Sequence, residues 1–249
     1  MLRQIFCLLV ALLIANVAVA DALRVGLSPD YPPLAYKQDE RVVGIEADNA
    51  TAVAKALGRP VRLVEFPFGE LIPALERGDI DVIMSGFSIT DERSARVLFT
   101  EPYMKVGQMA IVHRDKVARF AQPWSVYREG VRIGVEPDTT GAEFAERELG
   151  DAVVSFYANP DQAFAALRND RIDLYIHDAP TSWQLANVSG NNDLISLYTP
   201  LTEERLAWAV RKDDTALAAE LNRALRLMEN NGALQYILNR WIPVTVEVR

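Results

Sequence analysis

The chain has 249 residues, of which 50% are hydrophobic and 24% are charged, and it contains 13 Gly, 13 Pro and a single Cys. These fractions are typical of a globular protein and exclude disordered, collagen-like and disulfide-stapled classes, and the length predicts one large domain or two smaller ones. The formal net charge of −8 disfavours binding to nucleic acid or to an anionic membrane surface. One cysteine and two histidines are too few for a zinc site, so we expect no metal or cofactor.

The first twenty residues predict a secretory signal peptide. Arg3 supplies a basic start, residues 5–17 are almost wholly apolar, and Ala18-Val19-Ala20 forms a small-x-small cleavage site. An uncleaved membrane anchor is the alternative, but the apolar run is shorter than the ~20 residues that a membrane span needs. Cys7 lies inside the apolar run and not at the cleavage point, so it is not a lipid-attachment cysteine. We therefore expect cleavage after Ala20 and a soluble, periplasmic mature chain that contains no cysteine.

Beyond the signal peptide, short β-branched runs alternate with segments of helical period. This alternation predicts α/β layers with mostly parallel strands. The expected strands are 23–27, 62–66, 82–84, 109–112, 131–135, 153–157, 174–176 and 206–210. The expected helices are 48–57, 70–77, 91–97, 141–149, 161–168, 181–188, 215–229 and 233–241.

Two segments recur along the chain in the same order. Residues 24–30, RVGLSPD, are echoed by 132–138, RIGVEPD, and residues 74–82, ALERGDIDV, are echoed by 166–174, ALRNDRIDL. Either echo alone is weak, since helix–turn–strand units often look alike. Together they predict two similar α/β lobes, one beginning near Leu23 and the other near Val131.

Polar side chains cluster directly after the predicted strands. They occupy four segments: Ser28–Tyr31, Ser85–Arg93, Glu136–Thr140 and His177–Asp178. In open α/β sheets, ligands bind outside the carboxyl ends of the strands. Two lobes that face each other would therefore enclose a cleft lined by these four segments.

Arg93 is a candidate for binding a carboxylate. Thr90 is the expected N-cap of the following helix, and Arg93 occupies the position where a capping box would place Glu or Gln. A cation in the first turn opposes the helix dipole unless an anion compensates it, and arginine suits bidentate carboxylate binding. The alternative is a solvated arginine paired with Asp91 or Glu92.

Other candidates allow both a functional and a structural reading. The helix start at 136–141 offers free N–H groups to a carboxylate. Asp178 is either a counter-ion for a ligand ammonium or a plain N-cap. Tyr31 and Phe68 either stack on a ligand or belong to the core, and His177 is either a contact or a buried histidine. The sequence has no G-x-S-x-G, H-E-x-x-H or P-loop motif, so we expect no catalytic residue.

Residues from about Leu23 to Trp241 resemble the periplasmic amino-acid-binding proteins that feed ABC transporters. The match depends on the order and spacing of many short pieces, and its most specific part begins at Ser85. The pieces are Asp30-Tyr31-Pro32-Pro33, Gly44-Ile45-Glu46-Ala47-Asp48, Leu71-Ile72-Pro73-Ala74-Leu75, Gly78-Asp79-Ile80-Asp81, Ser85–Arg93, Phe99-Thr100-Glu101-Pro102-Tyr103, Thr139-Thr140-Gly141 and Ile172-Asp173 through His177-Asp178-Ala179-Pro180.

The resemblance implies two similar α/β lobes, joined by two hinge strands, that trap a free amino acid between them. This is the type II periplasmic-binding-protein-like fold. Residues 21–111 would form the first lobe, 112–207 the second, and 208–249 would return to the first. The crossings would lie near Ile111–His113 and Glu204–Trp208. The partner would be an ABC transporter permease in the inner membrane, and we expect a monomer.

The resemblance also implies roles for ten residues. Arg93 would grip the α-carboxylate of the ligand, helped by Ser88 and by the backbone at Gly86 and Thr140, and Asp178 would bind the α-ammonium. The side chain of the ligand would lie between Tyr31 and Phe68, with Ser28, Glu136 and His177 around its polar end.

Three positions depart from the family pattern. Ser28 stands where members that prefer cationic or amide side chains often have Asp, Asp138 replaces a Gly, and Asn49 replaces an apolar helix residue. Glu136 either restores a negative charge or faces solvent, so the class of side chain stays open.

Two alternatives to transport remain open. Cyclohexadienyl dehydratases are similar in fold, but such an exported enzyme would need an additional acidic group in the cleft as general acid. Thr181 and Ser182 offer none, and Glu136 is a conceivable substitute. The other alternative is a sensory ligand-binding protein with a different partner.

Overall fold

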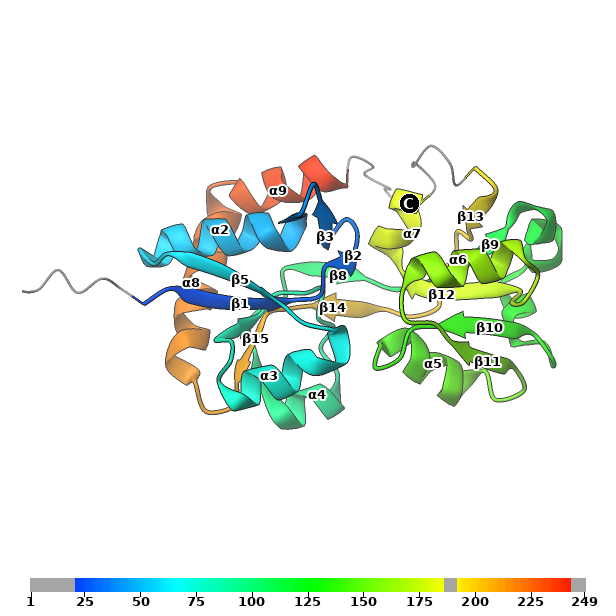
Figure 1. The fold of residues 1–249 in the computed structure, drawn as a ribbon, viewed down its shortest axis with the longest axis horizontal. Coiled ribbons are helices and arrows are strands. Elements are labelled where there is room, and N and C mark those ends of the chain that lie inside the picture. Colours follow the sequence, from blue (N-terminus) through cyan, green and yellow to red (C-terminus); the bar gives the residue numbers. More distant parts are fainter. Residues whose placement is uncertain (1–20, 186–191, 243–249) are drawn as a thin grey trace, which may run out of the picture.

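The structure is a computed structural model that describes residues 21–185 and 192–242. The predicted signal peptide, its cleavage site after Ala20 and Cys7 lie outside the described residues. The described residues form two α/β lobes side by side, which confirms the predicted fold class (Figure 1). No helix in these two ranges is long and apolar enough to cross a membrane.

The first lobe is built on a five-stranded sheet of order β5-β1-β6-β15-β7. Its strands are β5 (Val61–Glu65), β1 (Leu23–Leu27), β6 (Val82–Ile83), β15 (Ala209–Arg211) and β7 (Val97–Phe99). Its helices are α2 (Ile45–Leu57), η1 (Phe68–Glu70), α3 (Leu71–Arg77), α4 (Asp91–Arg96), α8 (Thr215–Asn230) and α9 (Ala233–Trp241). A small second sheet contains β2 (Asp30–Tyr31), β3 (Ala35–Gln38) and β4 (Arg41–Val43).

The second lobe repeats the plan with a sheet of order β11-β10-β12-β9-β13. Its strands are β11 (Val153–Phe156), β10 (Arg132–Val135), β12 (Leu174–Asp178), β9 (Gln108–His113) and β13 (Leu194–Ser196). Its helices are η2 (Arg114–Phe120), η3 (Pro123–Tyr127), α5 (Thr140–Glu148), α6 (Pro160–Arg168) and α7 (Ala179–Leu185). The last three residues of the predicted helix 181–188 lie outside the described residues.

Two short antiparallel strands, β8 (Met104–Val106) and β14 (Glu204–Leu206), connect the lobes. The second crossing thus falls within the range expected for it, but the first does not lie near Ile111–His113. Strand β9 belongs wholly to the second sheet, where it pairs with β12 and β13. The apolar run 109–112 marks a buried strand, whereas the actual crossing is only three residues long and carries a lysine.

Four of the five strands in each main sheet run in the same direction, as the sequence predicted, and one strand in each runs the opposite way. In the first sheet β1 pairs in parallel with β5 and β6, but β15 is antiparallel to β6 and β7. In the second sheet β10 pairs in parallel with β11 and β12, but β9 is antiparallel to β12 and β13. The parallel strands end at the cleft, whereas β9 and β15 follow directly after a crossing. These two strands start at the cleft and must run the opposite way.

Each sheet is covered by apolar side chains on both faces. In the first lobe α2, α8 and α9 pack on one face around fully buried Trp208, and α3 packs on the other around Leu71 and Leu75. In the second lobe Phe144 of α5 packs on one face and Phe164 of α6 on the other. This two-sided burial fixes the ends of the central strands, where the polar segments begin.

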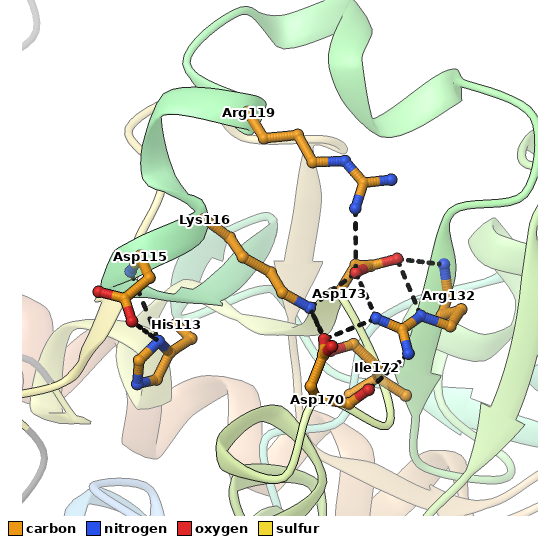
Figure 2. A network of polar contacts seen from close by, with 8 residues as sticks. All are labelled: His113, Asp115, Lys116, Arg119, Arg132, Asp170, Ile172 and Asp173. Atoms are coloured by element: carbon orange, nitrogen blue, oxygen red, sulfur yellow. Dashed lines mark hydrogen bonds and ion pairs between the residues drawn. The ribbon is translucent and has the colours of Figure 1, made fainter.

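Each lobe contains the same pairing of an arginine with an aspartate, which we call an Arg–Asp clamp. The pair is Arg24 with Asp81 in the first lobe and Arg132 with Asp173 in the second. The backbone N–H and Nε of Arg24 donate to Asp81 Oδ2 at 2.9 and 3.2 Å, and Nη2 donates to Oδ1 at 2.6 Å. Arg132 makes the same three contacts with Asp173 at 3.0, 3.2 and 2.8 Å (Figure 2). The sequence echo therefore corresponds to a repeated structure.

Candidate ligand-binding site

A cleft lies where the two lobes meet, and the space between its walls, including open solvent, is about 530 Å³. All ten candidate site residues line it, together with Asp30 and Thr139 from the same predicted segments and with Gln108 and Ile176 from outside them. The lining residues are Ser28, Asp30, Tyr31, Phe68, Gly86, Ser88, Arg93, Gln108, Glu136, Thr139, Thr140, Ile176, His177 and Asp178.

Arg93 lies in the wall that the first lobe contributes. Its backbone N–H is capped by Thr90 Oγ1 at 3.2 Å, as expected, but its side chain is only 7% exposed, so the reading as a solvated arginine is wrong. The guanidinium donates to the carbonyl oxygens of Ser88 at 3.1 Å and Asp138 at 2.9 Å, and it lies 4.3 Å from the ring centre of Phe87. None of the ion pairs among the described residues involves Arg93.

Burial lowers the pKa of Arg93, while the charges of Glu143 and Glu204 act in the opposite direction. An arginine nevertheless stays protonated at neutral pH. Arg93 is therefore a buried cation that contacts backbone carbonyls and aromatic rings. A buried charge of this kind is costly unless an anion pairs with it.

Position 86 requires glycine because of its backbone conformation and its close neighbours. Its φ of +61° is unfavourable for other residues, and a Cβ there would lie 2.6 Å from Tyr31 Cε1. Its N–H donates to the Oε1 of Glu46 at 2.7 Å. That N–H is therefore occupied and is not a free donor for a ligand carboxylate.

Glu46, which holds Gly86, is a residue that the sequence reasoning missed. It is fully buried on α2, and its carboxylate also accepts hydrogen bonds from Tyr103 Oη at 2.7 Å and Trp208 Nε1 at 3.2 Å. Burial raises its pKa, and the three hydrogen bonds oppose that shift. An acidic residue within an apolar helix start was the available signal for this anchor.

The aromatic candidates lie on both sides of Arg93 and His177. The ring of Tyr31 meets the ring of His177 edge-on, with centres 4.9 Å apart. Phe68, at the start of η1, lies 5.4 Å from the Arg93 guanidinium and packs against Phe87. Tyr31 Oη and His177 Nδ1 are buried, and neither has a hydrogen-bond partner among the described residues. Both atoms are therefore buried with their hydrogen-bonding capacity unsatisfied by the described part of the chain.

The second lobe contributes an acidic wall. Asp178, at the end of β12, is 8% exposed and accepts a hydrogen bond from Gln108 Nε2. Burial raises its pKa well above the usual range, and the nearby Glu204 carboxylate raises it further. Glu136 accepts a hydrogen bond from Tyr175 Oη, and its Oε1 lies 3.1 Å from His177 Nε2. No arginine or lysine of the described ranges pairs with either carboxylate.

Glu204 and Gln108, which the sequence analysis did not assign to the site, connect the two walls at the hinge. Oε2 of Glu204 accepts hydrogen bonds from Ser88 Oγ at 2.6 Å and Thr140 Oγ1 at 2.8 Å. Its Oε1 accepts from Thr202 Oγ1 at 2.7 Å and from Gln108 Nε2 at 3.1 Å. Gln108 is the first residue of β9, and Glu204 is the first residue of β14. Their contacts depend on how these strands are placed, which the short polar segments of the sequence do not indicate.

The charges of the cleft are unequal. The cleft is lined by one guanidinium, Arg93, and by the carboxylates of Asp30, Glu136 and Asp178, and Glu204 borders it through its hydrogen bonds to Ser88 and Thr140. No cluster of His, Cys, Asp and Glu in the described part of the chain could hold a metal ion. The arrangement is complementary to a small molecule with one carboxylate and more than one positive group.

The chain is similar in sequence to known proteins over most of its length. Residues 23–244 match the model of the bacterial extracellular solute-binding proteins, family 3. The chain is 29% identical to the ABC transporter arginine-binding protein 1 of Escherichia coli (strain K12), over 98% of this chain and all of that protein.

Solved structures give the same picture. A binding component of an ABC transporter from Wolinella succinogenes in complex with lysine has a TM-score of 0.84 and 30% identity, covering 90% of this chain and 97% of its own. An ancestral amino-acid-binding protein, described as a precursor of cyclohexadienyl dehydratase, has a TM-score of 0.82 and 31% identity, covering 88% and 95%. These neighbours are type II periplasmic amino-acid-binding proteins, which confirms the predicted architecture.

Proposed function

The chain belongs to the family 3 bacterial extracellular solute-binding proteins, and from that premise we propose that it captures a free cationic amino acid and delivers it to an ABC transporter permease. The extracellular character of the family and the predicted signal peptide support export to the periplasm. Relatives named for arginine binding and a neighbour complexed with lysine support the class of side chain.

One observation carries the proposal. Arg93 is a buried cation with no carboxylate partner among the described residues, and Asp178 is a buried carboxylate with no basic partner among them. Both line one cleft but come from different lobes. An α-amino acid carries the two complementary charges on one carbon, so it would neutralise both groups at once.

The remaining contacts follow from the donors and acceptors available. The ligand carboxylate would lie against Arg93 and the N–H groups of the first turn of α5, which begins at Thr140. The ammonium would lie against Asp178 and the carbonyl oxygen of Gly86. The aliphatic part of the ligand would pack against Tyr31 and Phe68.

Glu136 is our candidate partner for a cationic side chain. It is oriented by Tyr175 and His177, and it points into the cleft from the end of β10. Ser28 lines the cleft from the opposite lobe and contributes a neutral hydroxyl group. Family members that prefer cationic or amide side chains often have aspartate at this position. A guanidinium or ammonium would therefore find its carboxylate on the second lobe.

Binding would favour the closed arrangement of the lobes. Among the hydrogen bonds that cross between the lobes, Arg93 donates to the Asp138 carbonyl at 2.9 Å, and Thr181 Oγ1 donates to the Pro32 carbonyl at 2.7 Å. A ligand held by Arg93 on one side and Asp178 on the other would add contacts made only on closure, and it would shift the population accordingly. The permease would then recognise the closed form.

A thermal-shift screen of the purified chain from residue 21 onward, against the common amino acids, tests this function. A ligand at a hundred times its Kd stabilises the folded state by about 2.7 kcal/mol. We expect arginine and lysine to raise the melting temperature most, and glutamate and aspartate to have no effect. The proposal fails if no amino acid raises it.

An exported dehydratase is the second candidate, because the cleft contains the additional acidic group that such an enzyme needs. Glu204 lies beside Asp178, whose pKa is raised by burial and by Glu204 itself. The structural neighbour described as a dehydratase precursor belongs to the same fold. Incubation with prephenate or arogenate, monitored for aromatic product, distinguishes the two functions: turnover supports the enzyme, and its absence alongside amino-acid binding supports transport.

A further inference from the structure

Glu204 occupies two hydroxyl groups of the cleft that a ligand carboxylate could use. The resemblance implied that Ser88 and the backbone of Thr140 help to bind the α-carboxylate. In the structure both hydroxyl groups donate to Oε2 of Glu204, at 2.6 and 2.8 Å. A hydroxyl group carries one proton, so neither can donate to Glu204 and to a ligand at the same time.

The two oxygens of Glu204 have different surroundings. Oε1 is anchored near the crossing by Thr202 at 2.7 Å and by Gln108 at 3.1 Å. Oε2 alone reaches Ser88 and Thr140 in the cleft. A ligand carboxylate could therefore take over the contacts of one oxygen while the other keeps the side chain in place.

The contact between Glu204 and Ser88 belongs to the first lobe and its hinge strand. Ser88 forms an isolated bridge with Leu206 of β14, and the backbone N–H of Ile89 donates to the Arg205 carbonyl at 2.9 Å. Thr140 comes from α5 of the second lobe and reaches Glu204 across the cleft. Glu204 Oε2 therefore accepts hydrogen bonds from both lobes, as a ligand carboxylate between them would.

We propose that Glu204 is an internal competitor of the ligand carboxylate, and that it sets the affinity of the site for amino acids. The inference rests on the proposed function. Binding of an amino acid displaces Oε2 from Ser88 and Thr140 and brings a second negative charge close to Glu204. Arg93, which has no carboxylate partner in the described chain, supplies the attraction that makes this exchange favourable. A ligand that lacks a carboxylate has no need to displace Glu204.

The test uses arginine and agmatine, which differ only by the carboxylate, on the wild-type protein and on Glu204→Gln. A neutral amide holds the two hydroxyl groups less strongly and does not repel the ligand. We expect the Kd for arginine to fall by about tenfold in Glu204→Gln, the scale of one charge-assisted hydrogen bond. We expect the Kd for agmatine, measured by calorimetry at millimolar concentration, to stay within about twofold.

Glu203→Gln is the matched control, because it removes the same charge from an exposed neighbouring position. It should change neither Kd. If Glu204→Gln does not fold, Glu204→Ala provides the same comparison. Weaker or unchanged arginine binding in the folded variant, or equal gains for arginine and agmatine, would overturn the competition. Failure of the wild-type protein to bind any amino acid would instead overturn the proposed function.

Discussion

The two lobes share a scaffold but carry different side chains where it meets the cleft. Each has an Arg–Asp clamp at the start of its central parallel strand. Two residues after the arginine of each clamp, the strand has a glycine in close contact with an isoleucine. A Cβ at Gly26 would lie 2.2 Å from Ile80 Cδ1, and a Cβ at Gly134 would lie 2.6 Å from Ile172 Cδ1. The repeat seen in the sequence is thus a repeat of packing and hydrogen bonding.

The difference begins where these strands end. In the first lobe the backbone N–H of Ser28 donates to Ser85 Oγ at 2.9 Å. The equivalent positions of the second lobe are Glu136 and His177, whose side chains approach to 3.1 Å. Gly86 likewise corresponds to Asp178 in the aligned echoes. The scaffold fixes where these positions lie, and the side chains placed there make the second lobe acidic.

The largest effect on ligand binding should come from removing Arg93 of the first lobe or Asp178 of the second. Arg93→Ala and Asp178→Ala should each weaken arginine binding by about 2–5 kcal/mol, because each leaves the opposite charge of the ligand unpaired in a buried site. Isothermal titration calorimetry measures the loss. Arg96→Ala, on the same helix but in an exposed pair with Glu76, should bind normally. Near-native affinity in either cleft variant would refute the assignment.

The clamps should differ in their contribution to stability. Asp173 is 2% exposed and also pairs with Lys116 at 2.7 Å and Arg119 at 3.1 Å, whereas Asp81 is 13% exposed (Figure 2). We expect Asp173→Asn to lower the free energy of unfolding by about 3 kcal/mol and Asp81→Asn by about 1–2 kcal/mol. Urea denaturation checks both values, and equal losses would contradict the distinction.

The clamps also predict how stability depends on pH. Burial raises the pKa of both aspartates, but the arginine hydrogen bonds outweigh it and hold each pKa below the usual range. A depressed pKa stabilises the fold above the unfolded value of about 3.9, and this contribution is lost as pH falls below it. Stability should therefore decrease in acid, with a shallower decrease in Asp173→Asn than in Asp81→Asn. The opposite order would contradict this reading of the clamps.

A smaller effect on affinity should follow from moving the carboxylate from position 136 of the second lobe to the equivalent position 28 of the first. Glu136→Gln should raise the Kd for arginine by about tenfold, or ~1.4 kcal/mol, and change glutamine binding less, because only a cationic side chain needs the carboxylate. Ser28→Asp in the Glu136→Gln background should restore part of the preference from the opposite lobe. Calorimetry with both ligands measures the ratio. An unchanged ratio would show that Glu136 does not contact the side chain.

The sequence was most informative where local pattern and chemistry coincide. Helix α9 has the predicted bounds, as does β1, because the apolar pattern of each segment matches the period of its element. All ten candidate residues reached one cleft, since the ends of parallel strands meet at one edge of a sheet. These inferences needed only order along the chain and the general geometry of α/β layers.

What the sequence did not reveal depends on tertiary pairing. Strands such as β2, β4 and β8 have two or three residues, too few for a period to be recognised. The roles of Gln108 and Glu204 arise only when the crossing strands lie side by side. Similarly, the Gly86 N–H looked free until the fold brought Glu46 from a distant helix against it.

The central claim is that Arg93 and Asp178 bind the two charges of one amino acid from opposite lobes. A crystal structure of the mature protein in complex with arginine tests it most directly. We expect the α-carboxylate within hydrogen-bond distance of the Arg93 guanidinium, the α-ammonium against Asp178, and the guanidinium of the ligand beside Glu136. Arginine bound outside the cleft, or bound in it with its α-carboxylate away from Arg93, would contradict the claim.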